Sequence, residues 1–132
     1  MAYKGQPVPS TLVSITRAKI SDGKSVKVTV PENTSIKAQQ FYLLDGFFGI
    51  AMESIITVSG ETEELTLSIE QAEYETDNIV TTESFKVGEL IYWNSTSKKF
   101  TTTKGENRLV GKVTVAKDSN NVIWFLLLPQ QA

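Results

Sequence analysis

The second half of this sequence alternates short apolar segments with short polar turns, and this spacing restricts the chain to few folds. The apolar segments are Leu90–Trp93, Phe100–Thr103, Leu109–Ala116 and Val122–Leu128. Each is shorter than a typical helix and is followed by turn-forming residues, as Lys104–Asn107 follows the second. Four short strands in succession are typical of antiparallel sheets, so we predict a C-terminal β-meander.

The first half adds further strand signals. Valines alternate with polar residues over Val26–Val30, as in a strand that is buried on one face. Two apolar segments, Phe41–Leu44 and Phe47–Met52, flank Asp45-Gly46, a residue pair that favours tight β-turns. This pattern predicts a hairpin.

The segment Glu61–Tyr74 fits either a strand or a helical stripe, and we interpret it as a strand because its threonines lower helix propensity. The composition agrees, since 12 Val, 10 Ile and 15 Thr make the chain rich in β-branched residues. We therefore predict an all-β protein, a small antiparallel β-sandwich or barrel of about eight to ten short strands.

The N-terminus has a different character. Pro7 and Pro9 disfavour helix and central-strand pairing, and residues 1–20 show no clear period of either kind. We expect an extended N-terminal arm over residues 1–20 that lies along its own domain or along a neighbour. The 132-residue length suits one core, so residues 21–132 are expected to form a single β domain.

Several expected strands are apolar on both faces. In Val122–Leu128 neither the odd nor the even positions are polar, and the same holds for Leu90–Trp93 and for the hairpin strands. Either the chain covers the second face itself, or another subunit does, and we favour a homo-oligomer. At seven residues, Val122–Leu128 is the longest apolar run and is too short for a transmembrane helix, which needs about 20, so no membrane contact is expected.

Most enzyme classes are excluded by missing residue types. With no histidine and no cysteine, the chain cannot build a Ser-His-Asp triad, a cysteine nucleophile or a typical zinc site. A series of carboxylates between Glu61 and Asp77 matches no calcium-loop pattern, and no phosphate-binding glycine motif occurs. We interpret the acidic series as a solvated surface and expect no catalytic residue, metal or cofactor.

Charge is distributed unevenly along the chain. Residues 53–89 carry ten acidic residues against one lysine, whereas both flanking parts are net basic. Lysines between Lys98 and Lys117 are the only candidate basic face for nucleic acid, and we interpret them as a solvated rim. Such asymmetry can also set how subunits dock. No nucleic-acid partner is predicted.

Three short motifs follow one another in the second half of the chain. Gly88 precedes a Tyr92-Trp93 pair, Lys99-Phe100-Thr101-Thr102 follows a polar turn, and Gly111 lies in the next apolar segment. This series resembles the capsid decoration, or cement, proteins of tailed bacteriophages grouped as the DUF2190 family. Upstream, Asp45–Ala51 is similar to a glycine-containing strand of that family. Together the match spans about residues 26–128.

The resemblance implies a β-rich, non-enzymatic virion protein on the outer surface of the assembled capsid, often as a homotrimer, with the major capsid protein as partner. For capsid or subunit contact we single out Val8, Pro9, Leu12 and Ile15 in the arm, with Phe47 and Phe48 as weaker candidates. The family-motif positions are expected to be mainly structural: Gly46, Gly49, Gly88, Tyr92, Trp93 and Gly111.

An alternative is a small module that binds carbohydrate or a host surface and is displayed on the virion. Tyr92, Trp93 and Trp124 could stack on sugars or bases, although they lie within apolar runs typical of a core or a subunit interface. Solvent-facing aromatics in a groove would favour this alternative.

Overall fold

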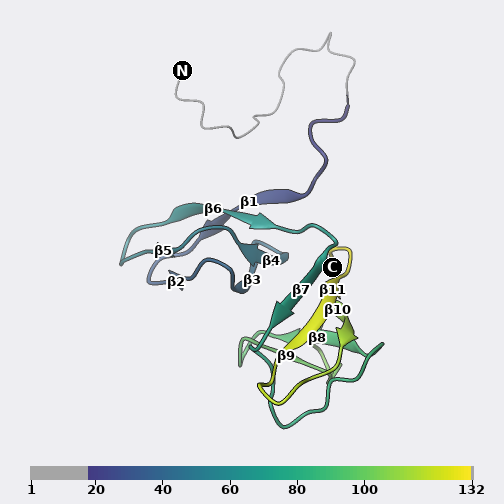
Figure 1. The fold of residues 1–132 in the computed structure, drawn as a ribbon. Helices are drawn as coiled ribbons and strands as arrows, with labels where there is room; N and C mark the ends of the chain where they lie inside the picture. Colours follow the sequence, from purple (N-terminus) through teal and green to yellow (C-terminus); the bar gives the residue numbers. More distant parts are fainter. Residues whose placement is uncertain (1–17, 132) are drawn as a thin grey trace.

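The computed structural model describes residues 18–131, which form eleven β-strands and no helix (Figure 1). The strands are β1 (Ser25–Val30), β2 (Ser35–Ile36), β3 (Phe41–Leu44), β4 (Phe47–Ala51), β5 (Ile55–Ile56), β6 (Glu63–Ser68), β7 (Glu73–Thr76), β8 (Leu90–Asn94), β9 (Lys99–Thr101), β10 (Arg108–Val115) and β11 (Ile123–Leu127). The all-β prediction is confirmed. The structure has one strand more than the eight to ten predicted, because it includes two strands of only two residues each, β2 and β5. Most of the predicted arm, residues 1–17, lies outside the described residues.

The first sheet has four antiparallel strands in the order β1-β6-β4-β3. The predicted hairpin joins β3 to β4, and its central residues Asp45 and Gly46 both have positive φ, 51° and 81°, as a tight hairpin turn requires. The carboxylate of Asp45 also accepts a hydrogen bond of 2.7 Å from the Thr29 amide of β1. The turn therefore ties both outer strands of this sheet together.

The ambiguous segment after Glu61 is extended. Leu65 and Leu67 of β6 are fully buried and alternate with more exposed residues, which confirms the strand interpretation. Alternation places both leucines on one face of the sheet, where a helix would have distributed them around its axis.

The second sheet has five strands in the order β7-β11-β10-β8-β9, with every pair antiparallel. All four strands of the predicted meander are present, but β10 pairs with β8 instead of β9. The other edge of β9 is bonded by the loop between β7 and β8, because the Phe100 amide donates to the Asn78 carbonyl and the Val80 amide to the Phe100 carbonyl, both at 3.0 Å. The meander prediction therefore fails at this one step.

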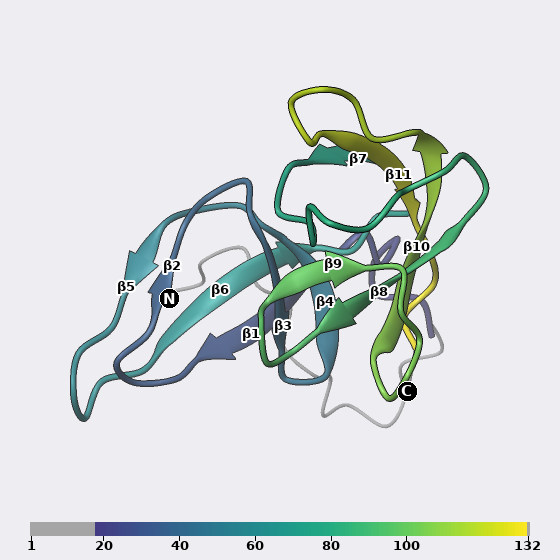
Figure 2. The same ribbon diagram turned by 90° about the horizontal axis from the view of Figure 1, so that it is seen from below.

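One segment touches both edges of the second sheet. β7 pairs with β11 at one edge, and residues 78–80 immediately afterwards bond β9 at the other. A sheet whose two edges meet the same short segment must curl, and in Figure 2 its strands wrap into a half-barrel.

The two sheets share an aromatic core. Phe41 of β3 lies 5.4 Å, centroid to centroid, from both Phe100 and Phe125, and Phe48 of β4 lies 5.0 Å from Trp93. These rings come from both sheets and are at most 4% exposed. Buried residues of both sheets therefore belong to one hydrophobic cluster at this junction.

The opposite face of the first sheet has its own core. Val28, Val30, Leu65 and Leu67 pack there with Ala51, and Ile36 of the β2–β5 ribbon covers them. Strands β3 and β4, which are apolar on both faces, thus bury their second face within the chain. For these strands the chain itself provides the cover, and no other subunit is needed.

Candidate interaction surfaces

The predicted contact residues fall into two groups. Val8, Pro9, Leu12 and Ile15 lie outside the described residues. Phe47 is half-buried and packs against the core of the first sheet. Phe48 is only 1% exposed and lies at the aromatic junction, so it offers no surface to another chain and the prediction that it is a contact residue is wrong.

The motif aromatics face opposite sides of β8. Trp93 is 4% exposed and packs on Phe48 and Phe100, so it belongs to the core. Tyr92 is half-buried on the other face, directly opposite Leu109 of β10. Of the three aromatic candidates for stacking, only Trp124 is substantially exposed, at 44%.

The motif glycines stand where a side chain is disfavoured. Gly46 completes the tight turn, and Gly88 has a φ of 90° in the loop before β8. A Cβ at Gly49 would collide with the Ser68 carbonyl oxygen, and one at Gly111 would lie 2.8 Å from the Phe125 ring. These positions let strands approach closely, which fits a structural role.

An apolar patch remains on the outer face of the second sheet. Leu90, Val115, Trp124 and Leu126 are each 42–44% exposed, and we call these four residues the outer patch. Strand register places them in two rows, because Leu90 lies opposite Lys112, which lies opposite Leu126, while Val115 lies opposite Trp124. Directly opposed residues point to the same face of a sheet.

Two glutamates of β7 border the outer patch. Glu75 accepts a 3.1 Å hydrogen bond from the Trp124 indole nitrogen, and Glu73 accepts one of 2.6 Å from the Thr114 hydroxyl. With Lys112 between Leu90 and Leu126, the patch combines apolar area with charge of both signs. This combination is typical of an interface with a polar rim.

A groove runs along β7 beside the first sheet. It has a volume of about 500 Å³ and is lined by Gln39, Gln40, Ile50, Glu73, Tyr74, Glu75, Thr76, Asp77 and Val122. We call it the edge groove, because β7 is the last strand of its sheet and pairs only with β11 among the described residues. Three of its lining residues on and after β7 are acidic and exposed, Glu73, Glu75 and Asp77, although the carboxylates of Glu73 and Glu75 also bond to Thr114 and Trp124 beside the outer patch.

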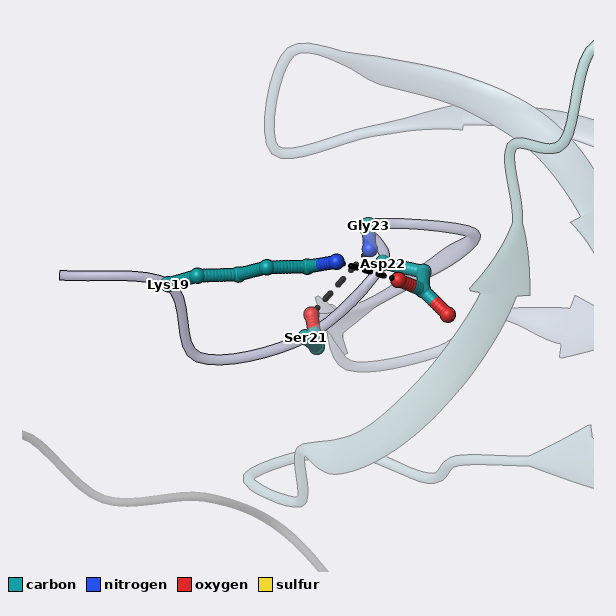
Figure 3. Close-up of polar contacts among 4 residues, drawn as sticks. All are labelled: Lys19, Ser21, Asp22 and Gly23. Carbon is teal, nitrogen blue, oxygen red and sulfur yellow. Dashed lines mark hydrogen bonds and ion pairs between the residues drawn. The ribbon is translucent and has the colours of Figure 1, made fainter. Parts of the chain in front are cut away.

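The described part of the arm begins next to a compact turn before β1. The Gly23 amide donates a 3.1 Å hydrogen bond to the Ser21 hydroxyl, and Lys19 and Asp22 form a 2.9 Å ion pair (Figure 3). Residues 18–24 are all exposed, and in Figure 1 they lead away from both sheets. This turn sets the direction of residues 18–20 relative to β1.

Sequence reasoning missed one polar cluster. The Glu83 carboxylate accepts hydrogen bonds from the Thr101 hydroxyl at 2.7 Å, the Thr102 amide at 2.7 Å and the Thr102 hydroxyl at 3.0 Å. Partial burial by itself raises the pKa of Glu83, but these hydrogen bonds stabilise the ionised form and lower the pKa overall. The cluster anchors the loop before β8 to the end of β9.

A second polar cluster joins the C-terminal segment to the first sheet. The Gln130 side chain pairs with the Phe48 backbone through two 2.8 Å hydrogen bonds, and Arg108 donates to the Gly46 carbonyl at 2.7 Å. Partial burial lowers the pKa of Arg108, whose ordinary value is far above neutral, so it stays protonated. Gln130 and Arg108 therefore connect the C-terminal segment and β10 to the β3–β4 hairpin.

The acidic series is dispersed over both sheets. Glu63 and Glu64 lie on β6, whereas Glu73 and Glu75 lie on β7. Within residues 18–131 no three acidic side chains gather in a way that could hold a metal ion. That part of the chain also lacks a helix with the length and apolar character of a membrane span.

Comparison with known proteins gives one distant structural likeness. The N base of head fiber gp8.5 of bacteriophage phi29 matches with a TM-score of 0.44 and 10% identity, over 82% of this chain and 98% of that one. This likeness is too remote to carry an argument about role. No curated protein matches the sequence.

The sequence itself matches a family. The family model described as phage cement protein covers residues 20–128, which include all eleven strands. This agrees with the motif resemblance and with the all-β fold. The chain therefore belongs to the phage cement protein family, whose members are structural, non-enzymatic components of the virion capsid.

Proposed function

We propose that this protein decorates the outer surface of an assembled phage head and stabilises it, acting as a homo-oligomer for which a trimer is the expected form. The family match over residues 20–128 is the observation that carries the proposal. The outer patch supports it, because an exposed apolar sheet face with a charged border suits contact with another protein.

Stabilisation would follow from linkage. A ligand that binds the assembled shell and not its separated subunits shifts the equilibrium toward the shell, by about 2.7 kcal/mol per site at a concentration 100-fold above Kd. An oligomer engages several sites at once, so moderate contacts add through avidity. No catalytic step is needed.

The proposed contacts are of two kinds. The outer patch meets a sister subunit or the major capsid protein, and the arm, through Val8, Pro9, Leu12 and Ile15, makes capsid or subunit contacts. Each patch side chain has already buried more than half of its surface, so covering the rest contributes only about 1 kcal/mol. Four such residues give about 4 kcal/mol from one partner's side, whereas micromolar association corresponds to about 8 kcal/mol after the cost of lost translational and rotational freedom is met. Contacts outside the patch are therefore expected to contribute as well.

The direct test compares mature heads that lack this protein with precursor shells. Purified protein should co-sediment with heads in a saturable manner, should not bind precursor shells, and should raise the temperature at which heads release their DNA. Binding to neither particle would overturn the proposal. Heat-denatured protein serves as the control for nonspecific adhesion.

One observation favours the alternative of a carbohydrate-binding or host-surface-binding module. The half-exposed Trp124 borders a shallow hollow of about 250 Å³ that Glu73, Tyr74 and Glu75 also line. An exposed tryptophan beside carboxylates can bind sugars by stacking and hydrogen bonding. Glycan binding that a Trp124→Ala variant loses, in a protein that does not bind heads, would favour the module.

A further inference from the structure

The edge groove presents an unsatisfied strand edge. Among residues 18–131, β7 has a partner strand only on its β11 side, and its other side faces the groove. The backbone groups along a free edge can pair with an additional strand, and such edges are common sites of strand addition. The groove volume of about 500 Å³ leaves room for an extended segment beside β7.

The groove also has a charge preference. Glu73, Glu75 and Asp77 are exposed along its β7 wall, and no lysine or arginine lines it. A segment that enters this groove is favoured if it carries positive charge and no carboxylates, because like charges along a strand edge destabilise pairing.

The arm of this chain has this character. Residues 1–17 contain no acidic residue and two basic ones, Lys4 and Arg17, of which Arg17 lies in the segment Ser10–Arg17. After Pro9, the segment Ser10–Arg17 contains no glycine or proline, and four of its eight residues are β-branched. Eight extended residues span roughly 26 Å, about twice the length of the four-residue β7.

The path of the chain points away from its own groove. Residues 18–24 are exposed throughout, and the turn at Ser21–Gly23 carries the chain outward from β1, away from both sheets (Figures 1 and 3). An arm that starts in this direction reaches a neighbouring molecule more readily than it folds back.

We propose that Ser10–Arg17 of one subunit adds as a strand to β7 in the edge groove of a second copy. The inference rests on the proposed homo-oligomer and supplies the contacts that the outer patch lacks. Backbone pairing provides affinity, and Arg17 at the end of the segment is favoured beside the acidic residues of β7. Residues 1–9 then extend beyond the groove, which leaves Val8 and Pro9 available for the capsid.

The absence of cysteine from the chain allows a clean crosslinking test. One chain carries Ser14→Cys in the arm, and another carries Gln40→Cys at the exposed groove wall. After mixing and mild oxidation, a covalent product of two chains should form at least tenfold more than with the control Ser59→Cys, which is exposed and outside the groove. Mass spectrometry should show the residue 14–residue 40 linkage.

Other outcomes overturn the inference. A chain with both cysteines that links only within itself would show that the arm covers its own groove, and a yield equal to the Ser59→Cys control would show that the arm does not enter the groove. Adding Asp77→Lys to the Gln40→Cys chain should reduce the yield severalfold, because it removes negative charge from the wall. Head binding by uncrosslinked protein, measured separately, would keep the proposed function intact if only the arm assignment failed.

Discussion

Glu83 is the most heavily hydrogen-bonded carboxylate among the described residues. Its oxygens accept from Thr101, Thr102 and, at 3.4 Å, Thr103, while the nearby Lys117 ammonium donates to the carbonyls of Thr81 and Glu83 at 2.7 Å. A loop without regular structure is thereby fixed to the end of β9. The same loop also provides residues 78–80, which bond the edge of β9 that β10 leaves unpaired.

The stability of the protein should depend on pH through Glu83. The pKa of Glu83 is lower in the folded protein than its ordinary value of 4.5, so ionised Glu83 stabilises the fold above that pH, and this contribution is lost as pH falls through the folded pKa. Urea unfolding should show wild-type stability decreasing below about pH 4.5. In Glu83→Gln this part of the decrease should be absent, and stability near pH 7 should fall by about 2 kcal/mol because charge-assisted hydrogen bonds are lost.

The matched control is Glu64→Gln, since Glu64 is exposed on β6. It should change neither the midpoint at pH 7 nor the shape of the pH profile. An identical pH profile for wild type and Glu83→Gln would contradict the assignment of the acid sensitivity to this carboxylate.

At the scale of the element, one residue of the β3–β4 hairpin, Asp45, stabilises both the turn and the outer strand β1. Asp45 occupies a positive-φ position of the turn and also accepts a hydrogen bond from the Thr29 amide across the sheet. Asp45→Ala should lower the free energy of unfolding by about 1–2 kcal/mol, because it strains the turn and leaves the amide without this acceptor. Asp45→Asn keeps a side-chain oxygen and tolerates positive φ, so it should lose less than half as much. Chemical denaturation measures both, and equal losses would contradict the double role.

The elements that sequence reasoning predicts correctly are those with local signals. Asp45-Gly46 between apolar segments predicts its hairpin, and the alternation of Leu65 and Leu67 predicts β6. The order of β9 and β10 in the sheet has no local signal, because it depends on hydrogen bonds between Phe100 and residues 78–80, about twenty positions earlier in the chain. Similarly, Glu83 meets threonines that follow it by 18 to 20 residues, and nothing in the local sequence of either marks the pairing.

At the scale of the whole molecule, Phe41 links the two sheets. Its ring contacts Phe48, Tyr74, Phe100 and Phe125 at centroid distances between 5.4 and 5.8 Å. Phe41→Ala should cost about 3–5 kcal/mol, since it removes a buried ring and leaves a cavity at the junction. Phe41→Leu should lower the free energy of unfolding by clearly less, because leucine fills part of the cavity. Calorimetry should show a single lowered transition for both variants, and two separate transitions in wild type would mean that the sheets unfold independently.

The apolar character of β11 has a different consequence from that of β4. Strand β4 covers both faces within the chain, whereas Trp124 and Leu126 of β11 keep almost half of their surface exposed. The apolar sequence pattern is alike in the two strands. The two strands differ in burial because the β2–β5 ribbon covers the outer face of the first sheet, whereas no such ribbon covers the second sheet among the described residues.

The last prediction follows from this exposed face. Sedimentation velocity of the wild-type protein at micromolar concentration should show an oligomer, and Leu90→Ser/Leu126→Ser should shift it toward monomer because about half of the outer patch is lost. The control Ile56→Ser/Val58→Ser alters two side chains that are 73% and 59% exposed on the first half of the chain, and it should leave the oligomer unchanged. If the control dissociates the oligomer and the patch variant does not, the subunits meet through the first sheet. If wild type itself sediments as a monomer, the outer patch meets its partner only on the assembled capsid, and the same patch variant should then lose binding to heads.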